Sequence, residues 1–223
     1  MCNYFQYQKL TFEDYFDDFS ETQIPLRFDG GKPNLLPPKE TVYPTNLVQA
    51  FRPVDPDNPS EGVEAAQFRW GLVPGFWRKS IKEWKATCFN ARSEEAAEKP
   101  AFRHSFKRRR CLIPATGFYD FTGPKGEKTR WLFQRNGVKW FAFAGLWDRA
   151  ETADGPVESC TLMTIAPGPD VDPYHHRQPV ILERDQWADW LNLETDVAPL
   201  FAVPPGGRLA VSQAPPLRRE PTD

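Results

Sequence analysis

The sequence predicts a single α+β domain over residues 1–223, with a mainly antiparallel sheet curled into a barrel-like core and a few short helices. Apolar, β-rich runs alternate with turn residues from about residue 111 to 167. The chain also holds 23 prolines, which favour turns over long helices. No repeat or linker divides the 223 residues, a length that suits one large domain. We expect the proline-rich tail to be mobile from about residue 214.

The first half of the chain alternates between turns and short regular elements. Four aromatic residues at helical spacing predict an amphipathic helix over residues 10–20. Residues 24–40 are rich in Gly and Pro and predict a loop. TVYPTNLVQAFRP (41–53) predicts extended segments broken by Pro44. AAQFRWGLVPGFW (65–77) predicts a buried strand that ends in a Pro-Gly turn. SEEAAEKPAF (93–102) predicts a short helix capped by Ser93.

The second half is richer in strands. CLIPATGFYDF (111–121), TRWLFQRN (129–136), KWFAFAGLWDR (139–149) and ESCTLMTIAP (158–167) have the spacing of a meander. Pro179–Leu182 predicts a further buried strand. RDQWADWLN (184–192) predicts the last helix, with its large apolar residues on one face.

Charge and cysteine usage narrow the functional classes. The net charge is −2, so any nucleic-acid role must come from a local patch. The four cysteines form no CxxC pair and no metal-ligand spacing, and we expect neither metal nor cofactor. The N-terminal residues lack the apolar core of a signal peptide, and no apolar run approaches bilayer length. These features predict a location in the reducing cytoplasm, or at the nucleoid in a bacterium, with no membrane partner. Nothing in the sequence looks like an oligomer interface, so we expect a monomer.

Cys2 is the first candidate functional residue. Removal of Met1 would leave an α-amine and a thiol on the same residue. A Cys near a chain terminus is more often inert than catalytic. A small second residue also permits the routine removal of Met1, so Cys2 need not have a chemical role. The functional interpretation therefore needs partners: an acid or base, an anion clamp and a cleft.

Two polar motifs supply candidate partners. In FNARSEE, Asn90 and Arg92 share a face if the segment is a strand, so they can bind an oxyanion. The alternative is that Arg92 pairs with a nearby Glu. In YHHRQPVIL, His175 and Arg177 share a face if extended, which favours a proton-transfer site. The alternative is a polar loop before a buried strand.

Asp120 lies in the apolar, aromatic run CLIPATGFYDF. Burial there would raise the pKa of its carboxyl group and suit a general acid or base. The alternative is that Asp120 faces outward from an exposed strand.

FRHSFKRRRC forms a dense basic patch inside a nearly neutral chain. Cations for phosphates and rings for base stacking are typical of single-stranded nucleic-acid binding. The candidate DNA-binding residues are Arg108, Arg109 and Arg110, together with Trp70 and Trp77 and, close by, Phe76 and Phe118. The alternative is a solvated charged face.

Five ordered motifs resemble one known family: Cys2 after Met1, FRWGLVP, NARSE, RRCLIPATGFYDF and HHRQPVIL. The sequence is similar to the SRAP family, whose name abbreviates SOS response-associated peptidase. The resemblance runs from residue 1 to about 183. It implies an SRAP-like barrel and a protein that senses abasic sites in single-stranded DNA. It also implies a covalent crosslink to the lesion through Cys2, exposed when Met1 is removed by self-processing or by an aminopeptidase.

The implied chemistry fits an N-terminal cysteine. An α-amine has a pKa of roughly 7.7–8.0 and a thiol one of about 8.5, so part of the amine is neutral at pH 7. The amine attacks the aldehyde of the open abasic sugar to give an imine, and the thiol closes a thiazolidine ring. By motif, Asn90 orients the N-terminus or the sugar, and Arg92 and Arg177 bind phosphate. His175 transfers protons, and Asp120 is the acid for Met1 removal and crosslink reversal.

The motifs depart from the family pattern at two positions. Asp120 stands where Glu is usual, and its shorter side chain can displace the carboxylate by about 1 Å, enough to cost on the order of 100-fold in rate. Gln178 stands where Met is common, and we expect little change from it. The sequence leaves two alternatives: an N-terminal-nucleophile hydrolase that uses Cys2 on amides, and a non-covalent single-strand-binding module.

Overall fold

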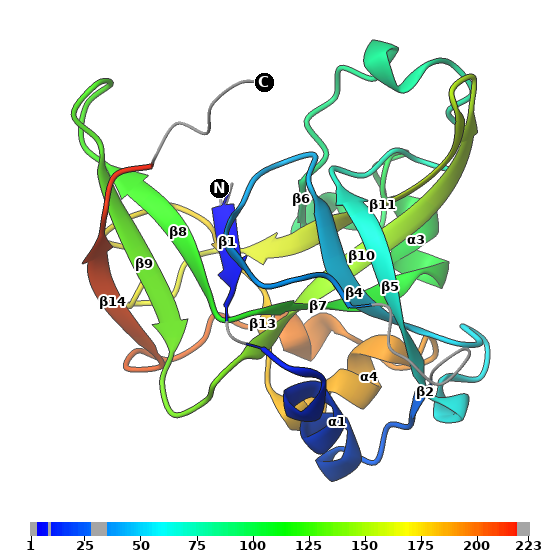
Figure 1. Cartoon of the computed structure of the whole chain (residues 1–223), viewed down its shortest axis with the longest axis horizontal. Coiled ribbons are helices and arrows are strands. Elements are labelled where there is room, and N and C mark those ends of the chain that lie inside the picture. The colour runs from blue at the N-terminus through cyan, green and yellow to red at the C-terminus, as the bar shows by residue number, and fades with distance from the viewer. Residues whose placement is uncertain (1–3, 9, 28–34, 218–223) are drawn as a thin grey trace.

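The computed structural model describes residues 4–8, 10–27 and 35–217. Its core is a closed barrel of five strands: β4 (Leu47–Pro53), β5 (Val63–Trp70), β7 (Arg110–Ala115), β10 (Phe141–Thr152) and β11 (Gly155–Ile165). Neighbouring strands pair in the order β11-β10-β7-β4-β5. Parallel pairing of β5 with β11 closes the ring, at Trp70 and Cys160 among others. The predicted α+β domain with a barrel-like core is confirmed (Figure 1).

A second sheet lies on the left of the barrel in Figure 1. It contains β14 (Leu209–Ala214), β9 (Thr129–Arg135), β8 (Gly117–Thr122), β1 (Tyr4–Tyr7) and β3 (Lys39–Val42), in that order. Only Thr116 separates β7 from β8, yet these two strands belong to different sheets. The predicted simple meander is therefore wrong. β8–β9 and β10–β11 are hairpins, whereas β7 pairs with β10 and β4.

Short edge strands extend the barrel sheet. They are β2 (Leu26–Arg27), β6 (Asn90–Arg92), β12 (Gln178–Pro179) and β13 (Ile181–Leu182). The loop predicted for residues 24–40 thus contains β2 and the start of β3. The predicted strand Pro179–Leu182 is divided between β12, which pairs with β11, and β13, which pairs with β10. Because β6 also pairs with β11, the NARSE motif and the segment after His175 border the same strand.

The helices are short, as the proline content predicts. They are α1 (Phe12–Glu21), α2 (Ser93–Ala96), α3 (Arg103–Arg108) and α4 (Trp187–Leu191), with 3₁₀ turns η2 (Pro59–Glu61), η3 (Ile81–Glu83), η4 (Arg184–Gln186) and η5 (Ala198–Phe201). The helix predicted over residues 10–20 is confirmed as α1, which begins with a Thr11–Asp14 capping box. The predicted cap by Ser93 is wrong, because Arg92 is the N-cap residue and makes no side-chain cap bond. The basic run holds α3, which the periodicity did not predict.

Aromatic packing joins the second sheet to the barrel. The ring of Phe5 in β1 lies 4.9 Å from that of Trp70 and 5.8 Å from that of Phe143. The barrel interior leaves no spare room: a Cβ on Gly145 would lie 2.8 Å from Cys111 Sγ. The residues of β1 are therefore held on a rigid support.

The C-terminal residues are more ordered than their composition indicates. Leu209–Ala214 forms β14, which pairs with β9. The proline-rich composition of this segment did not predict a strand. Of the tail predicted to be mobile, only residues 214–217 fall within the described part of the chain.

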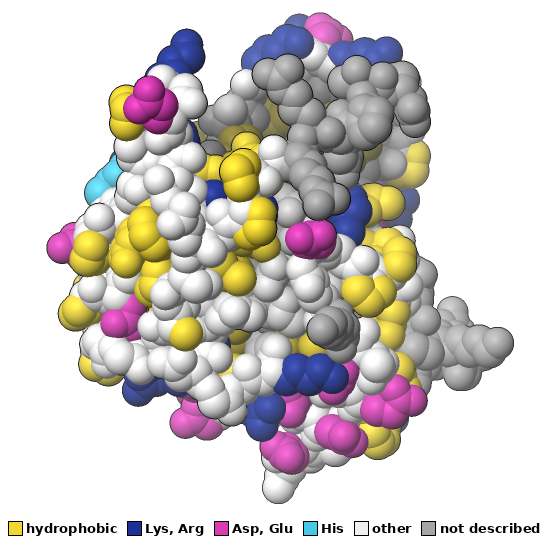
Figure 2. All heavy atoms as spheres, turned by 60° about the vertical axis from the view of Figure 1, so that its left-hand side comes forward, with side chains coloured by type: hydrophobic (Ala, Val, Ile, Leu, Met, Phe, Trp, Pro, Cys, Tyr) yellow, Lys and Arg dark blue, Asp and Glu magenta, His cyan; other side chains and the backbone are white. Residues whose placement is uncertain are grey.

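Figure 2 shows one face of the molecule, where hydrophobic side chains are scattered among acidic and basic ones. No helix within the described residues is long and apolar enough to cross a bilayer.

Candidate functional site

Asp120 lies in β8, opposite Trp131 of β9. It is only 5% exposed, so the alternative of an outward-facing Asp120 is wrong. Its Oδ1 accepts a hydrogen bond from the Phe121 backbone N–H at 3.0 Å, whereas Oδ2 has no hydrogen-bond partner in the part of the chain that the structure describes. Burial raises the pKa of Asp120, and positive charge at His175 opposes this rise. A buried, under-bonded carboxyl group is typical of a chemical site.

His175 faces this carboxyl group from the loop after β11. Its Nδ1 lies 3.7 Å from Asp120 Oδ2. The backbone N–H of Arg177 lies 3.0 Å from Nδ1 and the Arg177 carbonyl oxygen 3.1 Å from it. The N–H can bind an unprotonated Nδ1 and the carbonyl a protonated one, so the Arg177 backbone serves both states of the ring. Burial lowers the pKa of His175, and the charge of Asp120 opposes this effect. The pair is suited to proton transfer.

Arg177 is held by an ion pair that sequence reasoning missed. Its Nη1 and Nη2 donate to the two carboxylate oxygens of Glu94 at 2.7 and 2.8 Å, and Nη2 also donates to the Thr164 carbonyl at 2.7 Å. Hydrogen bonding to Arg177 lowers the pKa of Glu94 to about 2. The Nε of Arg177 is buried and has no hydrogen-bond partner in the described residues. Much of this guanidinium therefore ties the His175 loop to the NARSE segment.

Asn90 and Arg92 lie in β6, beside Leu162 and Thr164 of β11. Asn90 is buried, whereas Arg92 is exposed and its Nη1 lies 3.5 Å from Glu95 Oε1. The alternative that Arg92 pairs with a nearby Glu is thus confirmed, and phosphate binding by Arg92 stays a prediction. Because Thr164 also accepts from Arg177, β11 brings the NARSE and HHRQP motifs together.

Cys2 lies outside the described residues, but the strand that follows it is placed. Tyr4 pairs with Tyr119 in the antiparallel β1–β8 ladder, one residue from Asp120. The Tyr4 ring lies 5.4 Å from Phe121 and 5.3 Å from Tyr43. In the sequence Cys2 precedes Tyr4 by two residues, and two residues of extended chain span at most about 7 Å.

Two predicted DNA-binding residues are corrected by the fold. Trp70 is fully buried and its Nε1 donates to the Phe89 carbonyl, so its ring is not available to a base. Arg110 is only 5% exposed, and its guanidinium donates to the carbonyls of Phe106 and Asn192. Both predictions are wrong, because packing across the barrel encloses these side chains. Phe118, named beside them, is buried as well.

The other predicted DNA-binding residues remain accessible in part. Arg108 is exposed and lies 3.2 Å from Asp57, and Arg109 pairs with the buried Asp148. Trp77 is half-buried: its Nε1 donates to the Ser80 carbonyl and its ring meets Trp84 at 4.9 Å. Phe76, next to it, is 59% exposed. A DNA contact at Arg108, Arg109 and Trp77 stays a prediction.

The three described cysteines are unsuited to nucleophilic chemistry. Cys88, Cys111 and Cys160 are buried and free of disulfides, and burial raises the pKa of each thiol. The described residues also bring together no group of three or more His, Cys, Asp or Glu side chains able to hold a metal ion.

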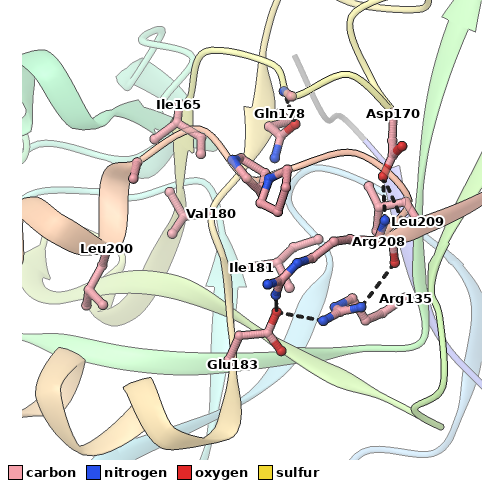
Figure 3. A pocket seen from close by; sticks show the side chains of 14 residues that line it. Arg135, Ile165, Asp170, Gln178, Val180, Ile181, Glu183, Leu200, Arg208 and Leu209 are labelled. Carbon is pink, nitrogen blue, oxygen red and sulfur yellow. Dashed lines mark hydrogen bonds and ion pairs between the residues drawn. The ribbon is translucent and has the colours of Figure 1, made fainter.

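A separate pocket lies between β9, β13 and β14 (Figure 3). Glu183 pairs there with Arg135 and Arg208, and Asp170 accepts hydrogen bonds from the backbone of Gly207, Arg208 and Leu209. Its volume of about 50 Å³ is far below the roughly 300–1,000 Å³ of ligand pockets. These polar groups satisfy one another and attach β14 to the loop that carries His175.

The family model for SOS response associated peptidase (SRAP) matches residues 1–213. The chain belongs to the SRAP family. It is 33% identical over 194 residues to the abasic site processing protein YoaM of Bacillus subtilis, and this alignment covers 86% of this chain and 79% of YoaM. It is 30% identical over 157 residues to the abasic site processing protein YMR114C of Saccharomyces cerevisiae, which covers 69% of this chain and 40% of that protein.

Solved structures agree with the fold. A protein from Bordetella bronchiseptica matches with a TM-score of 0.75 at 27% identity, over 96% of this chain and all of that one. A protein from Bacteroides thetaiotaomicron matches with a TM-score of 0.77 at 19% identity, over 96% of this chain and 93% of that one. The overall fold is therefore shared with these structures.

Sequence reasoning missed the partners that connect the motifs. Glu94 stands inside the quoted NARSE motif, but spacing could not show that it pairs with Arg177, 83 residues away. The buried Gln178 was expected to change little, yet its Oε1 accepts a hydrogen bond from the Gly168 backbone N–H at 2.6 Å. A polar residue where an apolar one is usual was the available signal for this second contact.

Proposed function

We propose that this SRAP protein processes abasic sites in single-stranded DNA by forming a thiazolidine crosslink through Cys2. The observation that carries the proposal is the buried Asp120–His175 pair, with Asp120 one residue from the partner of Tyr4 at the start of β1. Cys2 precedes Tyr4 by two residues in the sequence. The names of the curated relatives, which describe abasic-site processing, support the substrate class.

The reaction requires that Met1 be removed by hydrolysis, which frees the α-amine of Cys2. The amine nitrogen attacks the aldehyde carbon of the open sugar and forms a carbinolamine. Loss of its oxygen as water gives the imine. The Cys2 sulfur then adds to the imine carbon, its proton passes to nitrogen, and the ring closes. One water is released for each crosslink.

The polar residues of the site divide the proton transfers. Asp120, whose pKa is raised by burial, is suited to give a proton to the departing oxygen. His175, whose pKa is lowered by burial, accepts protons during sugar opening and imine formation. Asn90 orients the amine or the sugar from β6. The same acid assists Met1 removal and crosslink reversal.

Arginine side chains hold the strand beside the lesion. Arg92 is exposed at the end of β6 and can exchange its long contact to Glu95 for a phosphate. The Nε of Arg177 is a free buried donor within the described residues, while its terminal nitrogens are held by Glu94. Arg108 and Arg109, at the end of α3, and Trp77 extend the contact surface away from the lesion.

The test is denaturing electrophoresis and intact mass after incubation of the mature protein with abasic single-stranded DNA. We expect one adduct of one protein and one DNA less one water, absent in Cys2→Ala. Cys88→Ala is the matched control, because that thiol is buried and should leave the adduct unchanged.

Other outcomes would assign a different function. An adduct that persists in Cys2→Ala would contradict the thiazolidine chemistry. If wild type with Met1 confirmed absent gave no adduct, the crosslinking proposal would be contradicted, and a non-covalent binding module would remain as the alternative. Release of amide products without DNA would indicate a hydrolase.

A further inference from the structure

A second cleft, distinct from the Asp120–His175 site, lies beside α3. It is bounded by loop 74–78, the segment from Pro100 to His104, and Asp148 and Arg149 of β10. In Figure 1, α3 and β8 lie on opposite sides of the barrel, so this cleft is separate from Asp120. Its volume of about 490 Å³ falls within the range of roughly 300–1,000 Å³ typical of ligand sites.

The lining of this cleft is strongly basic. All its lining residues are described, and they include four arginines and one histidine against a single acid: Arg78, Arg103, Arg109, Arg149, His104 and Asp148. Four arginines against one aspartate leave three positive charges in excess, with His104 neutral. Such an excess, concentrated in one cleft of a chain of net charge −2, attracts anions.

The one acid of the lining is already satisfied. Asp148 is buried, and its Oδ1 accepts from Arg109 and from the Arg149 backbone N–H at 2.8 Å. Its Oδ2 accepts from the Gly75 backbone N–H at 2.8 Å. Asp148 therefore offsets Arg109 and does not compete for the other three arginines.

Those three arginines are available to a ligand. Within the described residues, Arg78 and Arg103 form no ion pair, and Arg78 donates to the carbonyls of its own loop. Arg149 pairs with Glu151, but both side chains are more than half exposed, and such pairs contribute little. A phosphate can replace these contacts, because guanidinium matches its geometry with two parallel hydrogen bonds.

The walls of the cleft are fixed before any ligand binds. The Gly75–Asp148 hydrogen bond ties loop 74–78 to β10. A Cβ on Gly75 would lie 3.0 Å from Asp148 Oδ1 and 3.1 Å from the Arg149 carbonyl oxygen, so the absence of a side chain permits this approach. A preformed site loses less entropy when it orders a ligand.

We propose that this cleft binds phosphate groups of the nucleic-acid backbone at a distance from the abasic sugar, without reading base sequence. The inference rests on the proposed function, since it extends the path of the same DNA strand. Two segments of the cleft lining flank β6 in the chain: loop 74–78 comes before Asn90, and the segment from Pro100 comes after Arg92. We take the DNA strand bound near β6 to continue toward Arg103. The spread of cations over three segments fits successive phosphates better than one small anion.

The experiment compares two double variants that each remove two positive charges. Arg103→Gln with Arg149→Gln removes two of the four arginines that line the cleft, and Lys125→Gln with Lys139→Gln is the control outside it. Binding to intact single-stranded DNA is measured by fluorescence anisotropy over a series of salt concentrations. Each phosphate contact contributes about 0.7 to the magnitude of the slope of log affinity against log salt. Loss of two contacts should therefore reduce the slope of the cleft variant by about 1.4, whereas the slope of the control variant should not change.

The two proposals fail separately. An unchanged slope in the cleft variant, or an equal loss in the control, would overturn the cleft as a phosphate site. Crosslinking is measured on abasic DNA too short to reach α3, where we expect the cleft variant to match wild type. Wild type that does not crosslink would reject the proposed function, while the salt slopes would still report on the cleft. Urea midpoints confirm that both variants fold.

Discussion

Two buried aspartates in this molecule have opposite surroundings. Asp148 in β10 receives three hydrogen bonds, from the Arg109 side chain and from the backbone of Gly75 and Arg149. Asp120 in β8 receives one, from the Phe121 backbone N–H, and its Oδ2 has no hydrogen-bond partner in the described residues. Burial of a charge without compensating hydrogen bonds is unfavourable. The fold therefore bears a desolvation cost at Asp120, whereas hydrogen bonds offset that cost at Asp148.

The difference separates a structural carboxylate from a chemical one. Asp148 joins loop 74–78, the end of α3 and β10, and its carboxylate is fully hydrogen-bonded by these partners. Asp120 faces His175 across 3.7 Å, with a pKa raised by burial. The same residue type can therefore hold a fold together or transfer a proton, according to how many donors surround it.

The largest effect on stability is expected for Asp148→Ala. The change leaves Arg109 without its partner and removes the acceptor for two backbone N–H groups. We expect the free energy of unfolding to fall by about 2–4 kcal/mol, below the roughly 3–5 kcal/mol of a fully buried pair because Arg109 is partly exposed. Urea denaturation measures it. A loss no larger than about 0.5 kcal/mol, typical of surface changes, would contradict the structural role.

Asp120→Asn should give the reverse pattern. We expect the crosslinking rate to fall by about 100-fold or more, as for removal of a general acid, while the free energy of unfolding stays level or rises. Single-turnover crosslinking and urea denaturation provide the two readouts. Asp120→Glu is the conservative control and should retain most of the rate. A loss of stability in Asp120→Asn as large as that in Asp148→Ala would contradict the assignment of a chemical role to Asp120 and a structural role to Asp148.

The pH dependence of stability should show opposite signs for the two site residues. The pKa of His175 is lowered on folding, so the stability that it contributes is lost as pH falls below its unfolded value of about 6.5. The pKa of Asp120 is raised, so its contribution is lost as pH rises above its unfolded value of about 3.9.

Unfolding of wild type and His175→Gln at about pH 7.5 and pH 5 tests the first sign, because the pair brackets the unfolded histidine pKa. Wild type should weaken relative to the variant at the lower pH. Asp120→Asn and wild type, measured at about pH 3 and pH 5, test the second sign, because this pair of values brackets the unfolded aspartate pKa. The variant should become more stable relative to wild type as pH rises. Parallel curves for wild type and both variants would show that neither pKa shifts on folding.

The smallest effect is expected for Gln178→Met. The change removes the hydrogen bond to the Gly168 N–H and replaces the amide by an apolar side chain of similar length. We expect a loss of about 1–2 kcal/mol in the free energy of unfolding, since a buried donor is left unpaired. A reduced crosslinking rate should accompany it, because Gly168 begins the loop that carries His175. Urea midpoints and single-turnover rates measure both, and a neutral result would restore the expectation that this position matters little.

Local patterns were sufficient for several elements and for the candidate acid and base. The spacing of aromatic residues predicted α1, and apolar runs between turn residues predicted β7 to β11. Asp120 in an apolar run was predicted to be buried with a raised pKa, and it is. These inferences succeed because periodicity and neighbouring residue types report directly on which side of an element is buried.

Long-range pairing decided the rest. Trp70 and Arg110 were predicted to meet DNA, but closure of the barrel by β5 and β11 and packing of α4 against β7 enclose them. The same closure set Glu94 against Arg177 and Asp148 against Gly75. By itself the sequence determined the order of the motifs, the strands and helix that carry them, and the candidate acid and base. Only the tertiary structure decided which arginines face solvent and which carboxylate lacks donors, because both depend on partners that lie far apart in the chain.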